Sequence, residues 1–476
     1  MKAFTEPLLS LAGFEEMTKT AEKSSGLISV TGCIDAQKSQ MIYAFGGHRK
    51  NKLIVTFGEQ KAKELYDEYS FFDKEVVYYP SKDVLFYQSD IRGNLLTAER
   101  IRALKAIREQ ERVTIVTTFD ALMNTMAPIE KMWENVLTLE QGQLLDLKEI
   151  QAALIRMGYE KEYQVQTMGQ FSVRGGILDV FPLTEENPIR IELWGDDIDT
   201  IRYFDCESQK SIENTDRVSI YPAAELVLSD EEKAGGIEKL KAEAKRVSDK
   251  LRKQMKTEEA HRVSVMADEL TEECGELSMY AGMDAFLSYF FDERVGLLDY
   301  FKPSDSLIFF DELTRCTEQG KLTETEFSES MKQRLAMGYI LPGQMNGLFT
   351  EKEIVAKLEK YSCIALGALD NKANGLHQLG SYGIHCQSVS PYNNSFELLI
   401  KDLKRYKKNG YRVILLSGSR TRAKRLSEDI TDQGITCFYT ENYDHELFEG
   451  QIMVCYGKVR RGFEYPILKF AVITES

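Results

Sequence analysis

The chain has 476 residues, a net charge of −15 and 43% hydrophobic residues. This length suggests roughly three domains, and the ordinary apolar and charged fractions exclude a disordered or fibrous chain. No apolar run approaches the ~20 residues of a membrane-spanning helix, and the acidic balance argues against a protein built mainly to coat nucleic acid.

Residues 1–132 alternate short apolar runs with amphipathic stretches, the pattern of a parallel sheet covered by helices. We predict a helix over 96–107 and buried strands at 27–30, 53–55, 76–79 and 113–116. Residues 133–224 predict a small β-rich insert. It begins with a helix at 147–157 and continues with strands at 171–173, 177–181, 189–194, 198–204 and 218–221.

Residues 225–383 continue the first domain after highly charged helices over 229–289, which are typical of a solvated hairpin or stalk. Buried strands at 307–310 and 363–366 resume the parallel sheet. Residues 384–476 predict a small α/β domain with a helix at 421–431 and strands at 413–416, 435–438, 452–454 and 470–473. Since the chain stops directly after a strand, we expect it to be a piece of a longer protein.

The segment 32–39 has the frame of a phosphate-binding loop, G-x-x-x-x-G-K-[ST], between a strand and a helix. Gly32, Lys38 and Ser39 match that frame. Gln37 replaces the second glycine, which lets the backbone wrap around phosphate, and Asp35 adds a carboxylate that repels it. A plain strand–helix connection with a chance match is the alternative.

Asp311 and Glu312 follow the strand at 307–310, where motor ATPases carry their magnesium-organising and water-orienting acids. The run 458–466 is similar to a motif of the second motor lobe, and no later arginine motif precedes Ser476. These features indicate α/β architecture with a degenerate RecA-like parallel-sheet domain, interrupted by the β-rich insert and followed by a second small α/β domain. We expect no catalytic residues, no bound cofactor and no ATP hydrolysis.

The insert presents a candidate binding face. Period-two alternation places Ile189, Ile191 and Leu193 on the core side of one strand, so Arg190 and Trp194 face outward. Arg174 lies likewise on the polar side of a neighbouring strand. Exposed Trp and Arg side chains are typical of interface hot spots. The alternative is that the helix at 147–157 covers the tryptophan.

Residues 170–182, 190–199 and 204–205 resemble a segment shared by two bacterial families, the B component of excinuclease ABC (excinuclease B below) and the transcription-repair coupling factors. The runs 297–312 and 337–342 also resemble both families, and they occur in the same order along the chain. Gln37 favours the coupling factors. The segment 78–96 also does, because it is too short and too poor in aromatic residues for the long hairpin with which excinuclease B locks DNA.

The resemblance implies an ATPase-inactive adaptor that recruits the A component of excinuclease ABC (excinuclease A below) to stalled RNA polymerase in transcription-coupled repair. Arg174, Arg190 and Trp194 would contact excinuclease A, on a face that a C-terminal domain masks in the family. RNA polymerase and DNA would be bound only by parts of the parent protein beyond Ser476. The rival interpretations are a divergent ATP-dependent excinuclease B or helicase, and an orphan α/β scaffold.

The remaining expectations concern ligands and location. The eight cysteines form no CxxC pair and the five histidines no HxxxH spacing, so we expect no metal site and reduced thiols in a cytoplasmic protein without membrane contact. DNA binding should be weak and salt-sensitive, and should come from the basic stretch 401–425.

Overall fold

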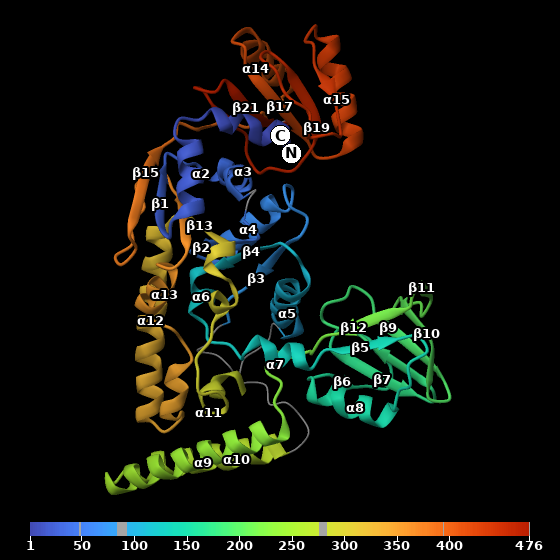
Figure 1. The fold of residues 1–476 in the computed structure, drawn as a ribbon, viewed down its shortest axis with the longest axis vertical. Helices are drawn as coiled ribbons and strands as arrows, with labels where there is room; N and C mark the ends of the chain where they lie inside the picture. The colour runs from blue at the N-terminus through green and yellow to red at the C-terminus, as the bar shows by residue number, and fades with distance from the viewer. Residues whose placement is uncertain (47–48, 83–92, 276–282, 394, 476) are drawn as a thin grey trace.

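The computed structural model describes residues 1–475 except 47–48, 83–92, 276–282 and 394. Figure 1 shows a central α/β domain with a second α/β domain at one end. The β-rich insert lies to one side and a helical hairpin crosses the other end. The segment 78–96, used to argue against a DNA-locking hairpin, falls partly outside the described residues.

The central domain is built on a parallel sheet, in which seven described strands follow the order β15-β1-β14-β13-β2-β4-β3. Six of these strands are short, mostly buried apolar runs, as expected for a sheet covered by helices on either side, whereas the edge strand β15 is polar and partly exposed. The strands are β1 Gly26–Thr31, β2 Asn51–Thr56, β3 Val76–Tyr79, β4 Val113–Thr118, β13 Ser306–Asp311, β14 Ser362–Leu366 and β15 Gln378–Gly383. The helices α3 Asp35–Phe45, α4 Glu59–Tyr69 and α5 Gly93–Glu109 connect the first four of these strands.

The insert is a curved antiparallel sheet in the order β11-β10-β9-β8-β7-β6, of which the last pair alone is parallel. Its strands are β6 Glu160–Lys161, β7 Gln170–Arg174, β8 Ile177–Val180, β9 Ile189–Trp194, β10 Asp197–Phe204 and β11 Ser211–Thr215. The helix α8 Leu147–Arg156 packs Leu154 against Ile191 and the other apolar residues of one sheet face. Two further strands, β5 Leu137–Glu140 and β12 Arg217–Ile220, pair beside the sheet where the chain enters and leaves the insert.

After the insert, α9 Asp230–Lys253 and α10 Thr257–Gly275 form the hairpin, which confirms the predicted charged helices. Ser229 caps α9, because its side chain accepts a hydrogen bond from the backbone of Glu232. α12 Leu313–Ala336 and α13 Glu351–Leu358 then cover one face of the main sheet. No described helix is both long enough and apolar enough to cross a bilayer.

The C-terminal domain places α14 Phe396–Lys408 and α15 Arg420–Asp432 on one face of a sheet ordered β16-β20-β21-β17-β19-β18. The strands are β16 Gln387–Ser388, β17 Arg412–Ser417, β18 Phe438–Tyr439, β19 Ile452–Tyr456, β20 Phe463–Tyr465 and β21 Phe470–Thr474. The opposite sheet face shares one apolar core with the central domain, in which Leu416 and Phe470 belong to the same cluster as Phe4 and Phe71. The two α/β domains are therefore packed together through a continuous buried surface.

The architecture confirms the predicted α/β class with its β-rich insert and second α/β sheet. One predicted strand is misplaced: residues 435–438 were expected to form it, but β18 begins only at Phe438. Ile435 is buried as a loop side chain beneath α15, which explains the apolar run. The short strands β5, β6 and β11 escaped prediction because they lack a continuous apolar run, and β6 and β11 are also mostly exposed.

Candidate functional site

The loop with the phosphate-binding frame lies between β1 and α3, and its first two backbone N–H groups are already hydrogen-bonded within the protein. Gly32 has φ +76, and its N–H donates to the carbonyl of Ala368 at 3.2 Å. The Cys33 N–H donates to the carbonyl of Gly367 at 3.0 Å. A phosphate cradle needs such N–H groups free to point at the ligand. Here they tie the loop to the segment that follows β14.

Lys38 lies at the centre of this site, and its side chain is 1% exposed. Its ammonium donates to Asp311 at 2.5 Å, to Glu312 at 2.9 Å and to Asp35 at 3.1 Å. Burial by itself would lower the pKa of Lys38, but the two acids at the end of β13 outweigh it and raise that pKa above its ordinary value. The lysine charge is thus held by the protein's own carboxylates.

Gln37 and Ser39 are buried in α3 rather than turned toward a ligand. The side-chain oxygen of Gln37 lies 3.4 Å from the hydroxyl of Tyr465, which belongs to the C-terminal domain. The same hydroxyl donates to Gln40 at 3.2 Å. The residue that replaces the loop glycine therefore lies at the contact between the two α/β domains.

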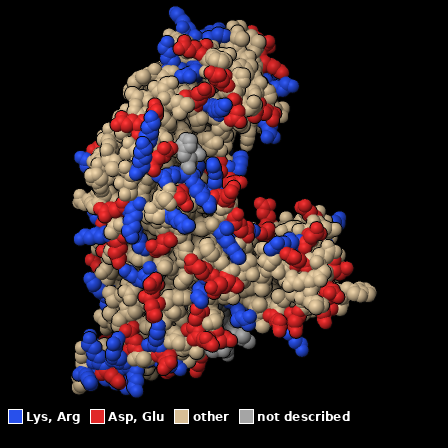
Figure 2. All heavy atoms as spheres, viewed as in Figure 1, with Lys and Arg blue, Asp and Glu red and all other residues tan. Residues whose placement is uncertain are grey.

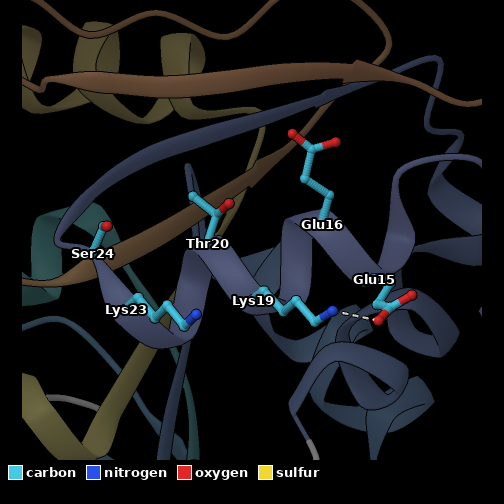
Figure 3. Close-up of a pocket in the computed structure, with 6 residues that line it drawn as sticks. All are labelled: Glu15, Glu16, Lys19, Thr20, Lys23 and Ser24. Atoms are coloured by element: carbon cyan, nitrogen blue, oxygen red, sulfur yellow. Dashed lines mark hydrogen bonds and ion pairs between the residues drawn. The ribbon is translucent and has the colours of Figure 1, made fainter.

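A separate hollow runs along α2 Phe14–Lys23, as Figure 3 shows. Lys19 and Glu15 pair across 2.5 Å on the helix surface, and the hollow is lined by Glu15, Glu16, Lys19, Thr20, Lys23 and Ser24. None of the residues of the phosphate-loop frame borders it. It is an open surface of mixed charge on a single helix.

On the insert, Asp179 organises the outer face of the sheet. Its carboxylate is 2% exposed and accepts hydrogen bonds from Arg190 at 2.7 and 2.8 Å and from Arg174 at 2.8 Å. Asp179 on β8 is directly opposite Arg190 on β9, and such cross-strand neighbours interact through their side chains. Sequence reasoning missed Asp179, although the alternation of residues 177–180 places it on the polar side.

Arg190 is more enclosed than its alternation position predicted, with a side chain that is 13% exposed. Its guanidinium stacks over Phe204 at 4.3 Å and also donates to Gln209 at 2.9 Å. Arg190 therefore also supports the fold, because without it Asp179 would lose a buried partner. Arg174 keeps 35% of its side chain exposed and remains the more accessible of the two arginines.

Trp194 is 82% exposed at the end of β9, just before a turn in which Gly195 has φ +67. The alternative that α8 covers the tryptophan is wrong, because α8 packs on the opposite face of the sheet. On the antiparallel sheet, Asp197 of β10 is directly opposite Trp194 of β9. On its other side, Asp197 forms an isolated antiparallel β-bridge with Leu144. Leu144 is also strongly exposed, and the exposed Asp197 lies between it and the tryptophan.

The comparisons with known proteins identify what the insert and the whole chain are similar to. Residues 137–226, which include the whole Asp179 network and Trp194, match the family model of the UvrB interaction domain. The transcription-repair-coupling factor of Bacillus subtilis is 27% identical over 425 residues, covering 89% of this chain and 36% of that protein. The chain is homologous to the N-terminal part of transcription-repair coupling factors.

Other coupling factors give the same result. Those of Staphylococcus haemolyticus and Staphylococcus aureus strain MRSA252 are each 26% identical, over 94% and 97% of this chain. They are matched over 38% and 39% of their own length, so the chain spans less than two fifths of these coupling factors. Across the described residues, no group of three or more His, Cys, Asp or Glu side chains is placed to hold a metal ion.

Proposed function

We propose that this chain is an adaptor without ATPase activity, which recruits excinuclease A through the outer face of the β-rich insert. In the parent coupling factor, this recruitment would bring excision repair to a stalled RNA polymerase. Homology to coupling factors and the match to the UvrB interaction domain support the assignment. Contacts with RNA polymerase in that process would belong to the rest of the parent protein.

The exposure of Trp194 is the observation that carries the proposal. A tryptophan that is 82% exposed leaves a large apolar surface in water, and burying it against a partner is favourable in proportion to its area. Trp and Arg are the residue types most enriched among interface hot spots. Trp194 would thus supply the desolvated anchor of the contact.

The charged residues around the tryptophan are already fixed. Asp179 holds Arg174 and Arg190, while Glu192 accepts hydrogen bonds from Arg202 at 2.5 and 2.9 Å. A surface whose side chains are ordered before binding loses little conformational entropy when the partner arrives. Arg174, the more exposed arginine, would offer charge-assisted hydrogen bonds to carboxylates of excinuclease A.

The degenerate nucleotide site supports the second half of the proposal. ATP requires a free lysine and free backbone donors, but Lys38 is bound by Asp311 and the Gly32 N–H by Ala368. A divergent excinuclease B or helicase would need both groups for phosphate binding and hydrolysis. The adaptor interpretation needs neither.

The test is a calorimetric titration of the intact chain with purified excinuclease A. Trp194→Ala is expected to weaken binding by about 30-fold or more, because truncating a hot spot typically costs at least ~2 kcal/mol. Phe448→Ala is the matched control, since Phe448 is an exposed aromatic residue of the C-terminal domain. Equal affinities for wild type and Trp194→Ala, or equal losses in both variants, would contradict the proposed contact.

A further inference from the structure

The tip of the hairpin formed by α9 and α10 carries concentrated positive charge. Residues 239–256 hold eight basic side chains and two acidic ones, a net charge of +6 in a chain whose total is −15. All eight basic residues are exposed. Figure 2 shows this concentration of blue at the hairpin end, and Figure 1 shows that this end points away from the insert.

Four of these cations form a stripe along one face of α9. Lys245, Arg246, Lys250 and Lys253 border one shallow solvent-facing hollow, together with Ala242 and Asp249. Eight residues separate the first cation from the last, which corresponds to about 12 Å of helix. Arg246 pairs with Glu243 at 2.7 Å. Within the described part of the chain, no ion pair involves the three lysines of the stripe.

The hairpin is held firmly against the body of the protein. Leu240, Ala244 and Leu251 of α9 pack into a core shared with α10. At the start of α10, the side chain of Arg262 donates to the carbonyl of Met337, just beyond α12, at 2.8 Å. Gly338 has φ +75, and a Cβ there would come within 2.5 Å of the Glu259 carbonyl oxygen. The stripe is therefore presented on a fixed support rather than on a free arm.

We infer that this stripe, defined as Lys245, Arg246, Lys250 and Lys253, binds the phosphodiester backbone of duplex DNA. Duplex DNA carries one negative charge per about 1.7 Å of its axis, so a helix face about 12 Å long meets several phosphates at once. The side chains contact no base, and binding should therefore be independent of sequence. The surface is distinct from the Trp194 face, so both can be occupied together.

The composition of the stripe favours DNA over an acidic protein. Interface centres between proteins are depleted in lysine and enriched in aromatic residues. The stripe has no aromatic residue, and the small side chain of Ala242 lies between its cations. The nearest exposed large apolar residue in sequence is Met255, which is on the turn between the helices rather than on the stripe. A row of cations without an apolar anchor matches a row of phosphates better than a folded partner.

The basic stretch 401–425, the sequence-based candidate for DNA binding, is divided by the fold. α14 ends at Lys408 beside the start of β17, whereas α15 begins at Arg420 beyond the end of that strand. Its two basic clusters therefore lie at opposite ends of a strand. In addition, Arg422 pairs with Glu475 at 3.1 Å and Arg420 with Glu441 at 3.4 Å. This stretch forms no single stripe comparable to that of α9.

The experiment measures binding of the intact chain to a fluorescent duplex of random sequence by anisotropy, over a series of salt concentrations. The test variant is the triple substitution Lys245→Gln, Lys250→Gln and Lys253→Gln. The matched control is Lys401→Gln, Lys404→Gln and Lys408→Gln, which removes three exposed lysines from α14. Circular dichroism and binding of excinuclease A establish that both variants remain folded.

Wild type should bind with a dissociation constant on the order of 10⁻⁶ to 10⁻⁴ M, and the log–log salt slope should be about −3 to −4. The α9 variant should bind at least 10-fold more weakly and lose about 2 to 3 units of that slope, while the α14 variant changes less than twofold. Three outcomes would overturn the inference: unchanged binding by the α9 variant, a larger loss in the α14 variant, or tighter binding of polyglutamate than of duplex DNA. Loss of DNA binding with intact binding of excinuclease A supports the inference independently of the proposed function.

Discussion

Lys38 on α3 places its ammonium nitrogen 2.5 Å from Asp311 Oδ1 on β13, and both side chains are 1% exposed. In a working motor ATPase, these two positions face phosphate and magnesium. Here they neutralise one another, and Thr56 donates a further hydrogen bond to Asp311 at 2.9 Å. The lysine of the phosphate-loop frame and the acid at the end of β13 are part of the buried structure.

Replacing Lys38 should therefore destabilise the central domain. Lys38→Met leaves Asp311 buried without its cation, and breaking a buried ion pair typically costs about 3–5 kcal/mol. Urea denaturation followed by circular dichroism measures the loss. The double variant Lys38→Met with Asp311→Leu should recover much of the stability, because it removes both charges. A single variant as stable as wild type would show that the pair does not support the fold.

Titration with ATP and magnesium should give no saturable heat. Lys38 is not free, and the N–H groups of Gly32 and Cys33 are hydrogen-bonded within the protein. Gln37→Gly should not restore binding, because the other groups remain occupied. A saturable heat that ADP displaces would contradict the assignment of a degenerate site.

Glu68 on α4 predicts an unusual pH dependence of stability. Burial raises the pKa of Glu68 to about 7, although the charges of Lys61 and Arg460 act to lower it. Between about pH 4.5 and 7, the folded state keeps a proton that the unfolded state has released, so stability decreases as pH rises. Glu68→Gln stays neutral and should be more stable than wild type by roughly 1–3 kcal/mol at about pH 8.

Below about pH 4.5, wild type and Glu68→Gln should be equally stable, because the carboxyl group is then protonated in both states. Glu64→Gln is the control in the same helix. The hydrogen bond from Arg460 lowers the pKa of Glu64, so this variant should gain no stability at high pH. Denaturation curves at several pH values measure all three proteins, and parallel profiles for wild type and Glu68→Gln would disprove the assignment.

Trp194 and Arg190 should differ sharply in their effect on folding. Trp194→Ala should change the free energy of unfolding by less than about 0.5 kcal/mol, since the side chain is mostly in solvent. Arg190→Ala should cost about 2–4 kcal/mol, because it removes two hydrogen bonds from the buried carboxylate of Asp179. Urea denaturation of the two variants is the measurement, and equal losses would show that the insert sheet is packed differently.

The sequence predicted those features that depend on local pattern. The apolar run 307–310 predicted the buried strand β13, and alternation along 189–194 predicted the outward position of Trp194. The partners of charged residues could not be predicted in the same way. Asp179 meets Arg190 because of the register between β8 and β9, and Lys38 meets Asp311 across 273 residues of chain. Such pairings are decided by tertiary packing, which periodicity does not encode.

If Trp194 anchors the proposed contact, it must become buried when excinuclease A binds. The chain contains two tryptophans, so Trp133→Phe leaves Trp194 as the single site for incorporated 5-hydroxytryptophan. The fluorescence of this analogue can be excited selectively, without exciting the tryptophans of the partner. The measurement is acrylamide quenching of this emission with and without excinuclease A. We predict strong quenching of the free chain and protection on saturation with excinuclease A. Unchanged quenching under conditions where calorimetry detects the complex would contradict the proposed anchor.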